Sequence, residues 1–154
     1  MLIHAQYPAI QIGEIFPVGV NGHGFSVEEA LNILDLYQKV NGEELGLVHI
    51  EPQFQDGFDP AMLKPLQSEL SQRRIPFGIL LHGLWDGQAR PSSNQAWRDN
   101  VIQQAALFAI AGVQPDQIVI QSWVEKPDQA VPDWEPYTFT NTVKEVVSHK
   151  TGNP

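Results

Sequence analysis

The chain has 154 residues and a formal net charge of −9, with 9 Lys and Arg against 18 Asp and Glu. Its length suits a single domain over residues 1–154, and its 42% hydrophobic and 18% charged content excludes wholesale disorder. The acidic balance argues against a nucleic acid or a membrane surface as partner, because both require a basic face. Since the chain also lacks cysteine, a signal-peptide pattern and any membrane-length apolar run, we expect a soluble, cytoplasmic protein.

The first predicted strand covers residues 9–17 and leads into the glycine-rich loop VGVNGHG. A helix should begin after Ser26, whose hydroxyl can cap it while Glu29 completes a capping box. Gly42 is expected to end this helix, because glycine adopts the left-handed conformation that helix ends require. The order so far is strand, then helix.

The second strand is predicted over residues 45–52, LGLVHIEP. Asp59 and Pro60 are typical of a helix cap and a first helical position. Pro65 lacks the N–H that the helix ladder needs, so we expect a kink or a restart there. The third strand follows over residues 76–85, PFGILLHGLW.

The strongest helical pattern runs from residue 94 to 111, with Gly112 as its end. A fourth strand is predicted over residues 116–125, and a last helix over 138–149. Four strand and helix units in succession predict parallel strands with right-handed crossovers, which occur in doubly wound sheets and in barrels.

The alternation of side chains along the strands distinguishes these two folds. One set is apolar throughout and is expected to face the helices: Ile15, Val48, Ile50, Ile79, Leu81, Ile118 and Ile120. The other set becomes polar near the strand ends: Glu14, His49, Glu51, His82, Gln121, Trp123 and Glu125. A doubly wound sheet would be apolar on both faces. We therefore predict an α/β fold, a parallel (βα)₄ half-barrel with helices on one face of the sheet.

Four strands leave a lumen face uncovered and two edge strands unpaired, which a soluble protein normally hides. The sequence therefore predicts either a homodimer whose halves complete one barrel, or a chain that belongs to a longer barrel.

Three stretches, IQIGEIFP, IPFGILLHG and VIQSWVEKPDQAVPDWEPYTFTNTV, resemble the C-terminal half of bacterial TIM-barrel proteins related to glycoside hydrolases. The resemblance implies that the four strands correspond to strands five to eight of the family, and that Trp123 forms the floor under a sugar. The strand that carries the general acid/base in the family is then absent. The strand that carries the family's nucleophile corresponds to the third strand here, which has His82 and Asp86 in place of a glutamate. The resemblance thus implies a carbohydrate site more firmly than it implies catalysis.

Glu14 and Glu51 are the candidate catalytic pair, because carboxylates at the ends of adjacent strands could approach the separation of about 5–5.5 Å that retaining glycosidases use. One would act as general acid and the other as nucleophile or stabiliser. The alternative is that both are solvated or salt-bridged residues at the rim.

His49, Glu51 and His82 allow a third reading, a metal-assisted hydrolase, since imidazole and carboxylate groups bind zinc. Their spacing matches no known metal signature, and a hydrogen-bonded structural histidine is the alternative. We expect no metal or other cofactor.

The expected ligand is a neutral carbohydrate or another small molecule, because aromatic faces stack on sugar rings beside a few polar groups. A non-catalytic ligand-binding or assembly module is the alternative to an enzyme. The candidate binding residues lie at or beyond the strand ends: His49, His82, Trp85, Asp86, Gln121, Trp123 and Glu125.

Overall fold

The computed structural model describes residues 6–7, 9–54, 57–85 and 88–151. Four parallel strands form one open sheet, in which the spatial order equals the chain order. The strands are β1 (Gly13–Val18), β2 (Leu47–Pro52), β3 (Phe77–Leu81) and β4 (Gln117–Ile120). The α/β class and the all-parallel sheet are confirmed, and the sheet does not close into a barrel.

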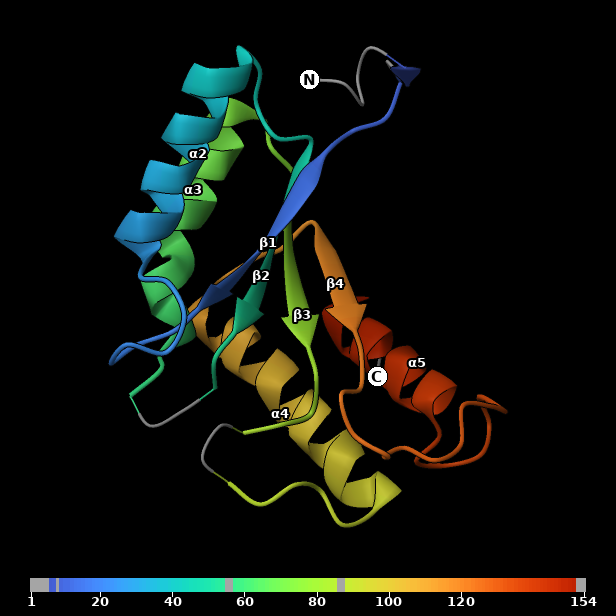
Figure 1. Ribbon diagram of the computed structural model, residues 1–154. Coiled ribbons are helices and arrows are strands. Elements are labelled where there is room, and N and C mark those ends of the chain that lie inside the picture. The colour runs from blue at the N-terminus through green and yellow to red at the C-terminus, as the bar shows by residue number, and fades with distance from the viewer. Residues whose placement is uncertain (1–5, 8, 55–56, 86–87, 152–154) are drawn as a thin grey trace.

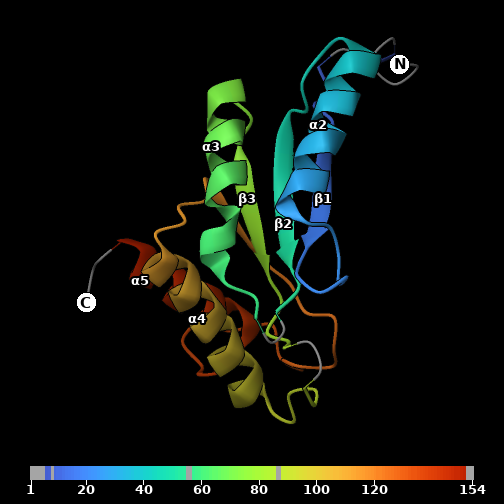
Figure 2. The same cartoon turned by 90° about the vertical axis from the view of Figure 1, so that its left-hand side faces the viewer.

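The helices lie on one side of this sheet (Figures 1 and 2). They are α2 (Val27–Asn41), the short 3₁₀ helix η1 (Pro60–Leu63), α3 (Lys64–Arg73), α4 (Asn94–Ala111) and α5 (Phe139–Thr151). α2, α3 and α4 pack toward the strands, and α5 packs against α4. No helix in the described part of the chain is long and apolar enough to span a membrane.

The helix ends follow the local chemistry of the sequence. Ser26 Oγ accepts from the Glu29 N–H at 3.2 Å, and the Glu29 carboxylate accepts from the Ser26 N–H at 2.8 Å, so the predicted capping box is confirmed. Gly42 ends α2 with a φ of 76°, in the left-handed region. The restart predicted at Pro65 is confirmed too, since the 3₁₀ turn η1 gives way to α3 there.

All four strands are shorter than predicted, and the second differs least from its predicted bounds. β1 begins at Gly13 because the segment before it turns, with the Ile10 N–H bonded to the Tyr7 carbonyl at 3.1 Å. β4 ends at Ile120, and Ser122 then holds a tight turn by donating to the Val124 carbonyl at 2.9 Å. A side chain that bonds its neighbouring backbone in this way competes with the strand ladder.

The predicted helix-facing set is correct for β2, β3 and β4 and wrong for β1. Val48, Ile50, Ile79 and Leu81 are all buried in the core, whereas Ile15 is 48% exposed. Phe16 and Val18 are buried in its place, with Phe16 paired to Ile50. Residues 15–18 are apolar at four consecutive positions, so alternation alone did not fix which set faces the helices.

Helix α4 fixes the segment that leaves β3 through three side chains on one helix face. Trp97, Asn100 and Gln104 satisfy buried and part-buried backbone groups of residues 82–84, which the strand ladder no longer reaches. The bonds run from Trp97 Nε1 to the His82 carbonyl (3.0 Å), from Asn100 Nδ2 to the Gly83 carbonyl (2.9 Å), from the Gly83 N–H to Gln104 Oε1 (3.1 Å) and from Gln104 Nε2 to the Leu84 carbonyl (2.5 Å).

We expect Gln104→Ala to lower the free energy of unfolding by about 2–4 kcal/mol, because one buried and one part-buried backbone group lose their partner. Gln103→Ala is the matched control, since Gln103 is exposed on the same helix and should change stability by less than about 0.5 kcal/mol. Urea denaturation followed by circular dichroism measures both. Equal effects of the two substitutions would show that the hydrogen bonds of Gln104 to the backbone of residues 83 and 84 do not stabilise the fold.

Candidate functional site

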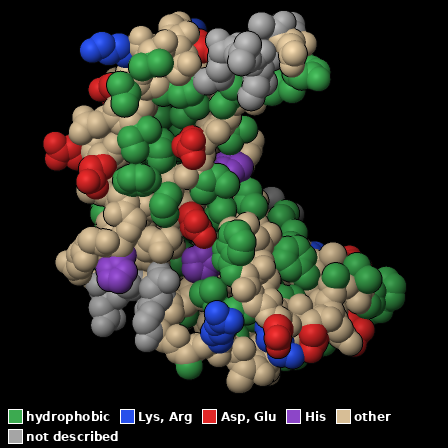
Figure 3. Space-filling view, in the orientation of Figure 1, with side chains coloured by type: hydrophobic (Ala, Val, Ile, Leu, Met, Phe, Trp, Pro, Cys, Tyr) green, Lys and Arg blue, Asp and Glu red, His purple; other side chains and the backbone are tan. Residues whose placement is uncertain are grey.

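The face of the sheet that carries no helix is called the open face below. It presents the side chains that alternate with the buried core residues, and the strand register sets them in rows. Figure 3 shows acidic and histidine side chains among hydrophobic ones down the middle of the molecule, where Figure 1 draws the strands. The first complete row contains Ile15, His49, Gly78 and Gln117, one residue from each strand.

His49 spans this row from β2 to β4. Its Nε2 lies 2.9 Å from Gln117 Oε1, and because an amide oxygen only accepts, Nε2 donates. The imidazole passes over Gly78 so closely that a Cβ atom there would lie 2.2 Å from His49 Cδ2. The absence of a side chain at Gly78 is therefore what allows the contact between His49 and Gln117.

The next row is centred on Leu80, which is 2% exposed and yet lies outside the main core cluster. Leu80 pairs with Val119 of β4. On the β2 side, Ile50 pairs with Ile79, and Glu51 is the next residue of β2. Glu51 and Val119 are both half-buried. This row thus places the Glu51 carboxylate beside the apolar side chains of Leu80 and Val119.

Gln121 follows at the carboxyl end of β4. Its backbone N–H donates to the Leu81 carbonyl at 3.0 Å, so the chain still runs beside β3 at this point. The side-chain Nε2 is buried and has no hydrogen-bond partner. An unpaired buried donor costs free energy, which a ligand that accepts its hydrogen bond would recover.

The expected pairing of Glu14 with Glu51 is wrong. Glu14 is paired with Val48, whereas Glu51 is paired with Pro17, three positions further along β1. Because side chains alternate between the faces, an offset of three positions puts the two residues on opposite faces. The error has the same origin as the misplaced Ile15, namely the reversed assignment of β1.

His82 is a structural histidine. Its Nδ1 accepts from the Leu84 N–H at 3.2 Å, so its Nε2 carries the proton and donates to the Pro52 carbonyl at 3.3 Å. The ring is buried and packs edge-on against Phe54, with 5.7 Å between ring centres. Both nitrogens are thus occupied within the protein.

The metal reading of His49, Glu51 and His82 is not supported by their placement. Over the described residues, no group of three or more His, Asp or Glu side chains is arranged to hold a metal ion. The arrangement of the described residues therefore gives no support to a metal-assisted hydrolase.

The remaining candidates are spread over the carboxyl end of the sheet. Trp85 is half-buried and contacts Phe54 edge-on at 5.3 Å, so it belongs to the packing around the core. Trp123 is 62% exposed just beyond β4, and Glu125 is exposed as well. Asp86 lies outside the described residues.

Sequence reasoning missed Gly78 and Gln117, although Gln117 lies two and four positions before Val119 and Gln121 on the same face.

Sequence reasoning also missed an apolar cavity of about 740 Å³ on the helix side of the sheet. This cavity lies over Ile79 and Ile118, beside the small residues of α4: Ala105, Ala106 and Ala109. The run of alanines is the signal that could have indicated it, and none of the predicted site residues lines it.

Comparisons with known proteins identify no relative for this chain: no family model matches it, and neither a curated protein nor a solved structure is significantly similar.

We expect Gly78→Ala to destabilise the fold by about 1–3 kcal/mol, because the new methyl group would overlap the His49 ring. In a His49→Ala background the same substitution should be close to neutral, since the obstructing ring is gone. Thermal and urea unfolding of the wild type, the two single variants and the double variant give the coupling energy. A penalty for Gly78→Ala that is equal in both backgrounds would refute the proposed contact.

Proposed function

We propose that the chain is a half-barrel domain that binds a neutral carbohydrate on its open face, near the carboxyl ends of the strands, without hydrolysing it. The half-barrel is supported by the strand order, which follows the chain as it does in barrels, and by the placement of the helices on one side. The resemblance of the strand-end stretches to glycoside-hydrolase-like TIM barrels supports the class of ligand.

The observation that carries the proposal is the buried, unpartnered Nε2 of Gln121. A sugar hydroxyl is both donor and acceptor, so one hydroxyl could accept from Gln121 and a neighbouring one donate to the half-buried Glu51. Trp123, exposed just beyond the end of the same strand, offers a flat apolar face for the ring. The combination of few polar groups with an aromatic face is typical of sugar sites.

Binding without hydrolysis is favoured because Glu51 has no carboxylate partner among the described residues that share its face of the sheet. Both glycosidase mechanisms need two carboxyl groups on either side of the scissile bond. Turnover of aryl glycosides that is lost in Glu51→Gln would instead support an enzyme.

A panel of neutral oligosaccharides, followed by tryptophan fluorescence and calorimetry, tests the site. We expect Trp123→Ala and Gln121→Ala each to weaken binding about tenfold or more, which corresponds to about 1.4 kcal/mol. Trp134→Ala is the matched control, because Trp134 is also highly exposed but does not lie at the end of β4. Failure of the whole panel to bind, or equal losses in the control, would contradict the proposal.

A second candidate is assembly, in which the open face pairs with a second copy to complete a barrel. The supporting observation is Ile15, an apolar side chain 48% exposed on the edge strand β1. An exposed apolar residue beside unpaired backbone groups is a typical contact for another chain. Ile15 lies at the early end of the open face, so a dimer contact there leaves the strand ends available to a ligand.

If the second copy packs on Ile15, the wild type should be a dimer by size-exclusion chromatography with light scattering, and Ile15→Lys should be a monomer. Burying an unpaired ammonium in an apolar contact is strongly unfavourable. Ile110→Lys is the control, since Ile110 is 84% exposed on α4, on the helix side of the sheet. A wild type that stays monomeric over a wide concentration range would rule out the homodimer.

A further inference from the structure

The segment between β4 and α5 exposes an unusual concentration of large apolar side chains. Beyond Trp123 they are Val131, Trp134 and Tyr137, of which Trp134 is 79% exposed. Residues 131–137 are called the aromatic loop below. Figure 3 shows hydrophobic side chains at the outer end of the lobe at lower right, with charged side chains beside them. Exposed apolar groups ringed by charges are typical of a protein interaction site.

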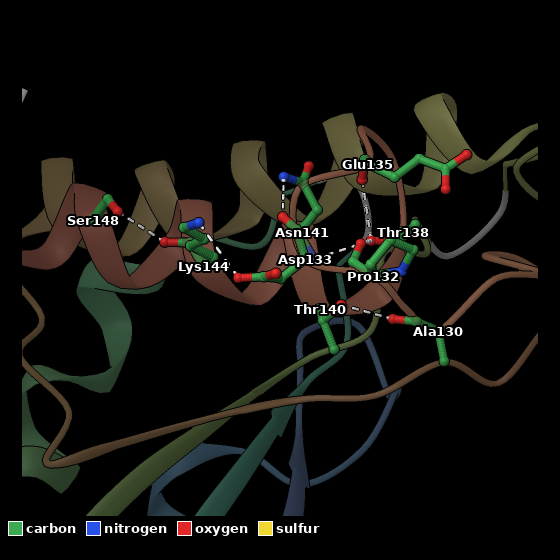
Figure 4. Close-up of polar contacts among 9 residues, drawn as sticks. All are labelled: Ala130, Pro132, Asp133, Glu135, Thr138, Thr140, Asn141, Lys144 and Ser148. Carbon is green, nitrogen blue, oxygen red and sulfur yellow. Dashed lines mark hydrogen bonds and ion pairs between the residues drawn. The ribbon is translucent and has the colours of Figure 1, made fainter.

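Side chains of the first turn of α5 and of the residue before it hold the backbone of the aromatic loop in place (Figure 4). Thr138 Oγ1 donates to the Pro132 carbonyl at 2.8 Å, and Asn141 Nδ2 donates to the Asp133 carbonyl at 3.0 Å. Just before the loop, Thr140 Oγ1 donates to the Ala130 carbonyl at 2.8 Å. Because its backbone is already fixed, the loop would lose little conformational entropy when a partner binds.

The lysines beside the loop are each neutralised by a carboxylate, so they add no net positive charge to this surface. Lys126 and Lys144 are both paired, with Asp128 at 2.6 Å and with Asp133 at 3.4 Å. The bonds from Lys126 and from Asn94 also hold the pKa of the Asp128 carboxyl below its usual value, so Asp128 stays ionised in this pair.

Glu135 is the acidic group of the aromatic loop that remains available. Its side chain is exposed, and Figure 4 draws its carboxylate pointing away from the contacts that fix the loop. It lies between Trp134 and Tyr137 in the sequence, on a chain whose net charge is −9. A cation that approaches the loop would therefore be attracted by a carboxylate of the same short segment.

We propose that the aromatic loop is a docking surface for a basic segment of a partner protein. An Arg or Lys side chain of that segment would stack on Trp134 or Tyr137 and pair with the Glu135 carboxylate. Guanidinium groups suit this surface best, because they stack on aromatic rings and pair with carboxylates through the same planar group. The negative charge disfavours nucleic acid and anionic lipid as occupants. This inference does not depend on the carbohydrate proposal.

Fluorescence anisotropy with a labelled peptide of alternating Arg and Gly tests the surface, with a peptide of alternating Glu and Gly as reference. We expect the basic peptide alone to bind the wild type. Trp134→Ala should weaken that binding about tenfold or more, as removal of an aromatic anchor does. Trp123→Ala should leave it unchanged, which separates this surface from the proposed sugar site.

Glu135→Gln and Glu28→Gln remove the same charge from two exposed positions, the second on α2. Docking at the loop predicts that Glu135→Gln weakens peptide binding and flattens its salt dependence, whereas Glu28→Gln leaves both unchanged. Equal effects of the two variants would mean diffuse attraction to an acidic protein and would overturn the proposal. So would no binding to the wild type, or a Trp134→Ala variant that loses oligosaccharide binding but keeps the peptide.

Discussion

The structure depends on the burial of one face of a parallel sheet. Parallel strands need crossover connections, and here the helices of these connections lie on the same side and bury Val48, Ile50, Ile79 and Leu81. A parallel sheet is normally covered on both faces. Both proposals for the open face follow from this imbalance, since the strand ends carry polar groups and the edge strand carries an exposed Ile15.

Local chemistry predicted the helices well. The cap at Ser26 and the helix end at Gly112 depend on residues within one turn, so the sequence contains all the information that they need. The role of Gln104 could not be predicted in this way, because its partners are backbone groups 20 and 21 residues away. Only the packing of α4 on the end of β3 brings them together.

The candidate site was predicted in part for a related reason. Alternation placed His49 and Glu51 on one face correctly, but it could not place Glu14, since β1 is apolar at four successive positions. His82 lies one residue beyond the end of β3, and its two ring nitrogens are bonded to the backbone of Pro52 and Leu84. Which polar groups remain free for a ligand depends on such contacts, and periodicity does not reveal them.

The hydrogen bond between His49 and Gln117 helps to set the register of β4 in the sheet. β4 has only four residues, so its few backbone bonds to β3 discriminate weakly against a slipped arrangement. A slip of one residue would turn Gln117 to the other side and leave the imidazole without its acceptor. The His49 side chain on β2 thus favours the observed register of β4. The absence of a Cβ atom at Gly78 on β3 allows the imidazole to reach Gln117.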